Sequence, residues 1–451
     1  MEDKKITLAQ ALRLSQSPCV AFVGAGGKTS AMFRIAHELA PALVTTSTHI
    51  GAWQAASASR HFIWPADGPM PEMEAQLGEG ITLVTGPLDP EKQRFTNLTP
   101  LQLEQLRDLA GYHALPLLIE ADGSRQKPLK APAEHEPAIP DFVDTVVVVA
   151  GLRGLQKALN EENVHRPEIF SRLGELPEGD PISALALAKV LSHPAGGLKN
   201  IPAAARRVAL LNQADTPELQ AQASEMEQRL LSVFDAMVVS SLDAPKGADR
   251  ETIIAIKENI GAVILAAGTA SRYGQPKQLL DYHGQPFVRV IAENALRAGL
   301  NPVIVICGAY EQAVSQAVID LPVQVLHNPD WQDGQSTSVK AGVRNLPTKT
   351  GGAIFLLADQ PQVSVELLRA LVERHSQDLP AVLAPYVFDQ RANPLLFDRV
   401  TFADMQTLSG DTGGRALFSK FSPRYLNWYD RRLLLDVDTP EDYARLLESE
   451  E

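Results

Sequence analysis

Short apolar runs of strand length recur along almost the whole chain, with helix-like segments between them. The runs are continuously apolar rather than alternating, which is typical of parallel strands that helices cover on both faces. One series comprises Cys19–Gly24, Leu43–Thr46, Ile81–Thr85, Leu115–Glu120, Thr145–Ala150, Val208–Asn212 and Met237–Ser241. A second comprises Val263–Leu265, Val303–Cys307, Val323–His327, Ala353–Ala358, Ala381–Pro385 and Leu433–Val437. This pattern predicts an α/β fold.

The two series of strands predict two domains. At 451 residues the chain is too long for one ordinary hydrophobic core. A turn-rich break covers Asp243–Asp249, and Arg250–Asn259 is typical of a short helix that leads into the second domain. We therefore expect one domain over residues 1–255 and another over 256–451, each built on a mostly parallel sheet.

The composition excludes several classes of protein. With 45% hydrophobic and 21% charged residues, the chain has the balance of a globular protein. No apolar run reaches the roughly 18–20 residues that would span a bilayer, so we expect no membrane partner. A net charge of −13 argues against a broad nucleic-acid surface. The charged, amphipathic first residues do not resemble a secretion signal, and we expect a cytoplasmic protein.

The two cysteines and two of the histidines have no motif around them. Cys19 and Cys307 each lie in an apolar, strand-like run, which favours reduced, buried thiols over a disulfide or a thiolate metal site. His283 and His327 are interpreted as structural residues because no motif surrounds them.

A glycine-rich segment follows the first strand and opens a helix expected over residues 30–40. Its ending, Gly-Lys-Thr, is that of a phosphate loop, in which backbone amides face the phosphates, Lys28 reaches terminal oxygens and Thr29 ligates Mg²⁺. The standard spacing requires glycine where this chain has Phe22, so a tight strand–helix turn is the alternative. The candidate nucleotide-binding residues here are Gly24, Gly26, Gly27, Lys28 and Thr29.

Other strand ends in the first half carry polar groups. The strand before Gly123 ends in two carboxylates, and we take Asp122 as the Mg²⁺-organising acid with Glu120 second. Residues 45–49 could serve metal-bound water or a phosphate, or form a solvated turn. Asp215 either reads a guanine base or caps a helix.

A proline-rich loop, Asp122–Pro137, carries three cations, Arg125, Lys127 and Lys130. We expect it to cover an anionic ligand, although a solvated charged loop is also compatible. Together with GAGGKTS, TTSTHI and the later VHRPE, this segment resembles the YqeC-type accessory family of selenium-dependent hydroxylases over roughly residues 8–245. The resemblance implies a nucleotide-dependent accessory role.

The densest chemistry lies in residues 262–280, AVILAAGTASRYGQPKQLL. A predicted strand precedes a loop of small residues, which lets backbone N–H groups approach phosphate oxygens. Arg272 and Lys277 follow and suit a triphosphate, whose charge must be neutralised before attack at phosphorus. The candidate residues for nucleotide binding are Leu265, Ala266, Ala267, Gly268, Arg272 and Lys277, the last two also catalytic.

The motif LAAGxxxRxGxxKxLL and four later segments resemble the nucleotidyltransferase family that includes the molybdenum cofactor guanylyl- and cytidylyltransferases. The later segments, in family order, are Asn328-Pro329 with Trp331 and Gly334-Gln335-Ser336, then Ala358–Pro361, Leu408–Asp411 with Gly414-Arg415, and Asp436–Pro440. The resemblance covers residues 262–447 and implies a Rossmann-like fold.

The resemblance and the strand order assign roles to these segments. Asp359 ends a predicted strand at the sheet edge where ligands bind, and we expect it to hold Mg²⁺ and to be catalytic. Asp438 is the second metal candidate, with Asp436 as its rival; one of the two should cap the following helix. The resemblance adds Gly334, Gln335 and Ser336 to the nucleotide site, with an N-capped helix as the alternative for the serines. It places Asn393, Asp411 and Arg415 at the acceptor.

The expected function is transfer of CMP, or less readily GMP, from CTP or GTP to molybdopterin, with the N-terminal domain assisting maturation of a molybdenum hydroxylase apoprotein. Two alternatives remain open. One is a non-catalytic, NTP-dependent accessory protein for such hydroxylases. The other is a nucleotidyltransferase that acts on a sugar or alditol phosphate.

Overall fold

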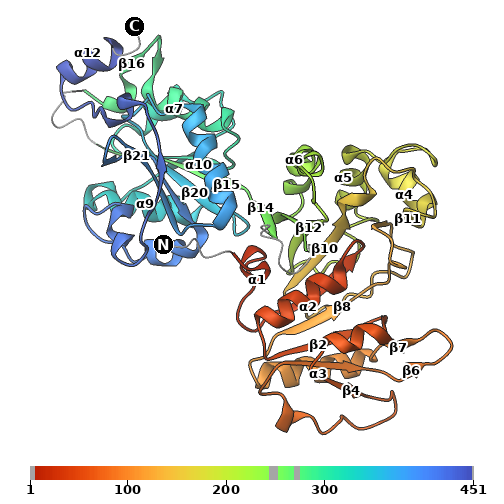
Figure 1. Cartoon of the computed structure of the whole chain (residues 1–451). Helices are drawn as coiled ribbons and strands as arrows, with labels where there is room; N and C mark the ends of the chain where they lie inside the picture. The colour runs from red at the N-terminus through yellow and green to blue at the C-terminus, as the bar shows by residue number, and fades with distance from the viewer. Residues whose placement is uncertain (1–5, 243–251, 269–274, 449–451) are drawn as a thin grey trace. The chain divides into compact units, whose positions relative to one another are not determined.

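The computed structural model describes residues 6–242, 252–268 and 275–448 (Figure 1). The chain divides into two compact units, Met1–Lys257 and Glu258–Glu451. Both units are mixed α/β structures with mostly parallel sheets. Among the described residues, no helix is both long and apolar enough to cross a bilayer.

The N-terminal unit is built on a nine-stranded sheet in the order β14-β13-β12-β10-β1-β8-β2-β5-β4. Its strands are β1 Cys19–Gly24, β2 Ala42–Thr46, β4 Arg60–Ile63, β5 Ile81–Thr85, β8 Leu117–Glu120, β10 Thr145–Gly151, β12 Arg206–Asn212, β13 Ala236–Ser240 and β14 Ile253–Lys257. All neighbours pair in parallel except β13 and β14. Every residue of β10 is buried, as expected for a central strand covered on both faces.

The helices of this unit are α1 Leu8–Ala11, α2 Lys28–Glu38, α3 Pro100–Tyr112, α4 Pro167–Gly174, α5 Ala184–Ser192 and α6 Pro217–Leu231. Small ladders join β3 His49–Gly51, β6 Leu88–Asp89 and β7 Arg94–Thr96, and pair β9 Leu129–Lys130 with β11 Val164–His165. These ladders fix the loops that follow β2 and β8.

The C-terminal unit contains an eight-stranded sheet whose main order is β19-β18-β15-β20-β23-β21-β22, with β24 paired to β21. Its strands are β15 Ile260–Ala266, β18 Val303–Cys307, β19 Gln324–His327, β20 Gly352–Leu357, β21 Val382–Val387, β22 Gln390–Arg391, β23 Leu395–Asp398 and β24 Arg424–Asn427. The hairpin β16 Asp281–Tyr282 and β17 Gln285–Pro286 lies outside it. The helices are α7 Phe287–Arg297, α8 Glu311–Ala317, α9 Gln335–Arg344, α10 Val365–Asp378, α11 Phe402–Met405 and α12 Pro440–Glu448.

Helices cover both faces of this second sheet. Along β15, Ala262 and Ile264 pack in one apolar cluster with residues of α7 and α10, whereas Val263 between them packs in another with residues of α9. Successive side chains of a strand point to opposite faces, so a strand buried on both sides is continuously apolar.

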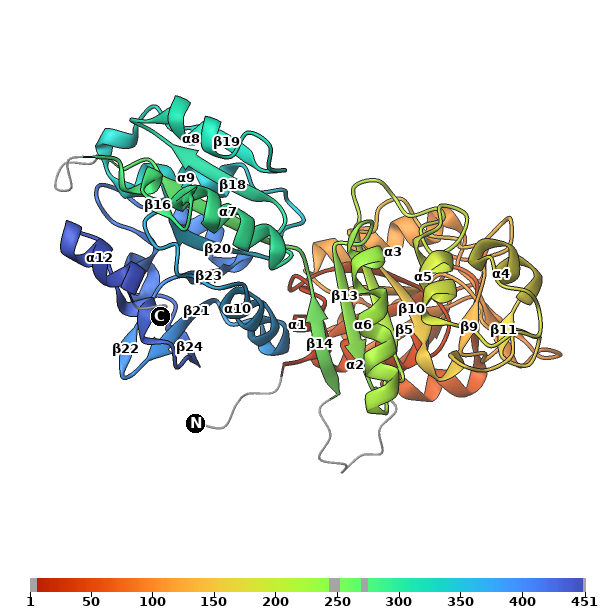
Figure 2. The same cartoon turned by 90° about the horizontal axis from the view of Figure 1, so that it is seen from above.

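Two predicted elements are wrong. The helix expected over Arg250–Asn259 is instead strand β14 within the described residues, which pairs antiparallel with β13 at the sheet edge (Figure 2). The strand expected at Leu433–Val437 is a short 3₁₀ helix, Arg431–Leu434, in which the Asp430 side chain accepts from the Arg432 N–H. The sequence interpretation also missed β23, whose antiparallel pairing with β20 places it inside the sheet.

Candidate functional sites

Each unit has a polar cavity of nucleotide size at the carboxyl ends of its parallel strands. The N-terminal cavity has a volume of about 540 Å³, and the C-terminal cavity about 740 Å³. Ligands of open α/β sheets bind at this edge, because the loops and helix N-termini that follow the strands converge there.

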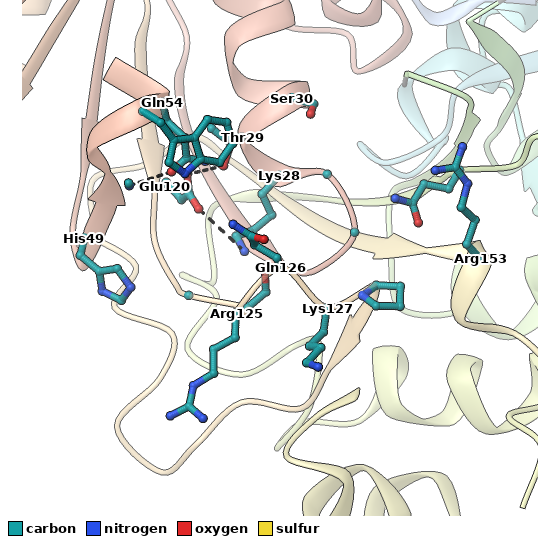
Figure 3. Close-up of a pocket in the computed structure, with 18 of the residues that line it drawn as sticks. Lys28, Thr29, Ser30, His49, Gln54, Glu120, Arg125, Gln126, Lys127 and Arg153 are labelled. Atoms are coloured by element: carbon teal, nitrogen blue, oxygen red, sulfur yellow. Dashed lines mark hydrogen bonds and ion pairs between the residues drawn. The ribbon is translucent and has the colours of Figure 1, made fainter. Parts of the chain in front are cut away.

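The N-terminal cavity is built around the turn between β1 and α2 (Figure 3). Gly24 has φ +97°, and a Cβ on it would lie 2.1 Å from the Val149 carbonyl oxygen, so this turn requires glycine. Helix α2 begins directly afterwards at Lys28. Gly26, Gly27, Lys28 and Thr29 line the cavity, whereas Gly24 does not.

Lys28 and Thr29 make contact with acidic groups at the end of β8. The Lys28 ammonium donates to the Gly24 carbonyl oxygen at 2.7 Å and lies 3.2 Å from Asp122 and 3.9 Å from Glu120. The Thr29 hydroxyl donates to Glu120 at 2.8 Å and accepts from the Gln54 amide. Burial raises the pKa of the Glu120 carboxyl, although Lys28 and Thr29 oppose this shift.

The two carboxylates of this strand end differ in their surroundings. Glu120 lines the cavity, whereas Asp122 is buried behind it, between Lys28 and Lys130, and accepts from the Gly24 N–H at 2.9 Å. The order of preference in the sequence interpretation, Asp122 before Glu120, therefore does not match the geometry. Glu120 is the carboxylate that a metal ion in the cavity could reach together with Thr29.

The rim of the N-terminal cavity is basic. Among the described residues, six lysines and arginines line it, against one acidic residue, Glu120; the six are Lys28, Arg94, Arg125, Lys127, Arg153 and Lys157. Arg125 and Gln126 have φ values of 50° and 61°, which turn their loop sharply at the cavity. A cavity with this charge balance suits a polyanionic ligand such as a triphosphate.

Sequence reasoning identified Arg125 and Lys127 on this rim but missed Arg94, Arg153 and Lys157. These three lie in segments without a motif, and only the fold brings them together. The His49 ring lies 2.7 Å from the Arg94 guanidinium, and its pKa is lowered by burial and by that charge.

Other predicted polar groups have structural roles. The Thr45 and Thr46 hydroxyls donate to backbone carbonyl oxygens inside the sheet. Asp215 pairs with Arg153 and does not line the cavity. It is not the cap of α6 either, because the Thr216 side chain accepts from the Leu219 N–H.

Lys130 is buried in an ion-pair chain rather than facing the cavity. It contacts Asp122 at 2.9 Å and Glu136 at 2.8 Å, and Glu136 also accepts two hydrogen bonds from Arg166. Burial alone would raise the pKa of Glu136, but the hydrogen bonds from Arg166 and Lys130 outweigh it and lower the pKa to about 2. This chain ties the loop after β8 to β11.

We expect Glu136→Gln to lower the free energy of unfolding by about 1–2 kcal/mol at pH 7. Because the folded-state pKa lies below the unfolded value, the stabilisation is present above about pH 4 and is lost as pH falls toward 2. Urea unfolding between pH 7 and pH 3 should show the deficit shrinking. Glu134→Gln, an exposed neighbour, is the control; an equal deficit at every pH would contradict this account.

The C-terminal cavity lies where β15 and β20 end side by side. Leu265 pairs with Leu357 in register, and the Ala358 N–H donates to the Leu265 carbonyl oxygen at 3.2 Å. The turn after β15 and the acid after β20 therefore lie at the same edge. The predicted residues that line this cavity are Leu265, Ala266, Ala267, Gly268, Lys277, Gly334, Gln335, Asp359 and Asp411.

The amide of Gln278 was missed by sequence reasoning. It lies in the interior and donates to the carbonyl oxygens of Ala266 and Gly268, both at 3.3 Å. It thereby holds the turn in shape. Arg272, predicted to bind phosphates, lies outside the described residues.

Lys277 contacts one carboxylate, that of Asp438, and its charge acts on a second, that of Asp359. The Lys277 ammonium lies 2.6 Å from Asp438, and Asp436 accepts from the Gln360 amide at 2.9 Å. The pKa of Asp359 is raised, first by burial and then by the charges of Asp436 and Asp438, while Lys277 opposes the shift. Asp359 is thus influenced by two other carboxylates and by one ammonium, and the excess negative charge of this group fits a divalent cation.

Neither Asp436 nor Asp438 caps α12, contrary to the prediction. The Thr439 hydroxyl accepts from the Asp442 N–H at 3.2 Å, and the Asp442 carboxylate accepts from the N–H groups of Thr439 and Asp438. Thr439 and Asp442 thus satisfy the helix start reciprocally, which leaves Asp438 to contact Lys277.

The start of α9 forms the opposite wall. Gly334 has φ +107°, and a Cβ there would lie 2.5 Å or less from the backbone of Gly410, so the two chain segments touch. This contact brings Asp411 to the cavity, where its carboxylate accepts weakly from the Gln335 N–H at 3.4 Å. Ser336 is buried and does not line the cavity, and no side chain caps α9, so the alternative of a serine N-cap is wrong.

The other two predicted acceptor residues lie together outside the cavity lining. The Arg415 guanidinium donates to the Asn393 side-chain oxygen at 3.2 Å. The structure thus brings Asn393 and Arg415 into contact with each other, and Asp411 into contact with the start of α9.

Comparisons with known proteins match the two halves separately. The family model of YqeC protein matches residues 20–168, and that of the MobA-like NTP transferase domain matches residues 262–425. The protein YqeC of Escherichia coli (strain K12) is 33% identical over 218 residues, covering 47% of this chain and 82% of YqeC.

Other relatives include proteins that correspond to the region of the MobA-like model. Nicotine blue oxidoreductase of Paenarthrobacter nicotinovorans is 33% identical over 204 residues, covering 42% of this chain and 96% of that protein. Molybdenum cofactor cytidylyltransferase of Escherichia coli (strain K12) is 24% identical over 189 residues, covering 41% and 93%. The chain therefore belongs to the YqeC family through its N-terminal half and to the MobA-like NTP transferase family through its C-terminal half.

Proposed function

We propose that the C-terminal unit transfers CMP, in preference to GMP, from a nucleoside triphosphate to the terminal phosphate of molybdopterin. One observation carries this proposal: the small-residue turn after β15, Lys277 and Asp359 line one cavity. An oxygen of the molybdopterin phosphate attacks the α-phosphorus of the nucleoside triphosphate and forms a new P–O bond. The bond between the α-phosphorus and the pyrophosphate leaving group breaks in line with this attack. Catalysis of such a step depends mainly on positioning and on balancing charge.

In this proposal the backbone of the turn 265–268 approaches the nucleotide, and Lys277 balances negative charge on its phosphates. Asp359, with Asp438 beside Lys277, would hold Mg²⁺. When bound, this ion would neutralise charge that develops on the phosphate oxygens. The raised pKa of Asp359 supports the assignment, because a cation relieves the cost of a buried carboxylate among other carboxylates.

The acceptor side is assigned to Asp411, Asn393 and Arg415. Arg415 offers a guanidinium that can pair with the phosphate of the acceptor, and its contact with Asn393 holds it in place. The choice of molybdopterin rests on similarity to the cytidylyltransferase relative. A sugar or alditol phosphate is the alternative acceptor.

The N-terminal unit is proposed to bind a nucleoside triphosphate and to assist maturation of a molybdenum hydroxylase in the cytoplasm. The basic rim and the phosphate-loop-like turn before Lys28 support nucleotide binding. If the whole chain is instead a non-catalytic accessory, an NTP-dependent pulldown of such a hydroxylase should occur without any pyrophosphate release.

The donor is tested by pyrophosphate release from the full chain with each of the four nucleoside triphosphates, Mg²⁺ and molybdopterin. We expect CTP to give at least about a tenfold higher kcat/KM than GTP, because a pocket that hydrogen-bonds one base rejects another. Sugar and alditol phosphates serve as competing acceptors. Reduced nicotinamide cofactors are included because one relative is named an oxidoreductase; their oxidation without pyrophosphate release would overturn the proposal.

A further inference from the structure

Three side chains of different chemistry converge beside the C-terminal cavity, at the ends of β18 and β19. Cys307 and His327 are the last residues of these strands and face each other in parallel register. Glu311 is the first residue of α8, and its carboxylate lies 3.2 Å from the His327 Nδ1. One ligand atom from each of the three lies within 4.8 Å of the other two. Figure 2 shows β18 and β19 side by side.

We propose that Cys307, Glu311 and His327 bind a divalent transition-metal ion of the Zn²⁺ class. Thiolate, imidazole and carboxylate are the ligands that Zn²⁺ takes in proteins, at about 2.0–2.3 Å, whereas Mg²⁺ prefers oxygen ligands alone. Tetrahedral ligand atoms at those distances lie about 3.3–3.8 Å apart. The Glu311–His327 separation is already close to this range, and the thiol would need to move by about 1.5 Å at most.

The surroundings of the cluster allow an ion to enter. The side chains of His327 and Glu311 are 41% and 51% exposed, while Cys307 is fully buried beneath them. Its thiol donates to the Leu326 carbonyl oxygen, at 3.3 Å, and this proton would be released when the metal binds. Three protein ligands leave a fourth position for water or for a ligand atom.

The site is positioned to influence the nucleotide cavity. Gly308 follows Cys307, and a Cβ on it would lie 2.7 Å from the Trp331 ring and 2.8 Å from the Ala267 carbonyl oxygen. Asn328 follows His327 and donates to Thr337 and Ser338 at the start of α9. Trp331, Ala267 and Ser338 line the cavity. An ion bound by both Cys307 and His327 would therefore hold together the two segments that follow these residues, and both segments shape the cavity.

The proposed metal site does not depend on which reaction the cavity supports. It can be tested by adding Co²⁺ to the full chain in the presence of a reductant that contains no thiol. A bound cobalt thiolate gives a charge-transfer absorption band, and the chain has only two cysteines. We expect the band in wild type and in Cys19→Ser, at one equivalent of Co²⁺, and its loss in Cys307→Ser. Cys19 is the matched control because it is also a free thiol.

Because Cys307 is buried, its substitution could disturb folding, so the exposed ligands supply a second test. We expect His327→Ala and Glu311→Gln to bind Co²⁺ and Zn²⁺ on the order of 100-fold more weakly, since each ligand contributes to the affinity. His283→Ala, an exposed histidine of the same unit, should bind as wild type does. Excess Zn²⁺ should raise the melting temperature of wild type but not of His327→Ala. If Cys19→Ser shows no band, or His327→Ala binds as tightly as wild type, the cluster is only a histidine–glutamate pair.

Discussion

Asp359→Asn is expected to lower kcat/KM for pyrophosphate release by on the order of 10³-fold without lowering the melting temperature. The amide keeps the shape of the side chain but removes the charge that would hold the divalent ion against the triphosphate. Stability should hold or rise, because burial and the nearby Asp436 and Asp438 already raise the pKa of this carboxyl and so disfavour its charged form. Loss of activity with retained stability separates a role in the site from a folding defect.

A matched control for this variant is Asp320→Asn. Asp320 belongs to the same unit, but it is exposed and pairs with Arg289 at 2.6 Å on the surface. Pyrophosphate release should be unchanged in this variant. If Asp359→Asn retained wild-type kcat/KM at saturating Mg²⁺, the assignment of the C-terminal site would be wrong.

Sequence reasoning predicted most of the parallel strands because their burial on two faces leaves a continuous apolar run, as in β10 and β18. It failed where tertiary pairing decides the outcome. Charged residues lie before and after the apolar residues of 253–257 in the sequence, as in a short surface helix. Residues 253–257 nevertheless form a strand that pairs antiparallel with β13. Strand β23 is four residues long and follows a proline, so its local pattern does not distinguish a strand from a loop.

The position of the candidate sites could be predicted where one segment carries the chemistry. The turns before Lys28 and after Leu265 follow predicted strands directly, and the structure places both at cavities. Residues contributed by distant loops were missed: Arg94 and Arg153 reach the N-terminal cavity only through ladder β3–β7 and the segment after β10. The sequence also could not predict which carboxylate at the end of β8 faces the cavity. Asp122 is enclosed by two lysines and Glu120 faces the cavity, but no local sequence feature distinguishes them.

Lys28→Met is the second substitution with a large expected effect. Lys28 is 3% exposed, lines the cavity and lies within 4 Å of both Asp122 and Glu120. A triphosphate in the cavity would compete with these carboxylates for its ammonium, so Lys28 should weaken its carboxylate contacts when nucleotide binds. We expect the variant to lose on the order of 100-fold in affinity at this cavity. It should also be less stable, because a buried ion pair loses one partner.

Titration calorimetry with a non-hydrolysable nucleoside triphosphate analogue measures this effect in the full chain. Wild type should bind two equivalents, and Lys28→Met and Lys277→Ala should each bind one, because each cavity provides one site. Arg125→Ala guards against a folding defect. This residue lies on the cavity rim and forms no ion pair with another residue that the structure describes, so its loss should weaken binding about tenfold with an unchanged melting temperature. Arg34→Ala, a half-exposed cation on the same helix as Lys28, should bind as wild type does. If Lys28→Met still binds two equivalents with wild-type affinity, the turn before α2 is only a strand–helix connection. A phosphate site at this turn would lose affinity when its most deeply buried ammonium is removed.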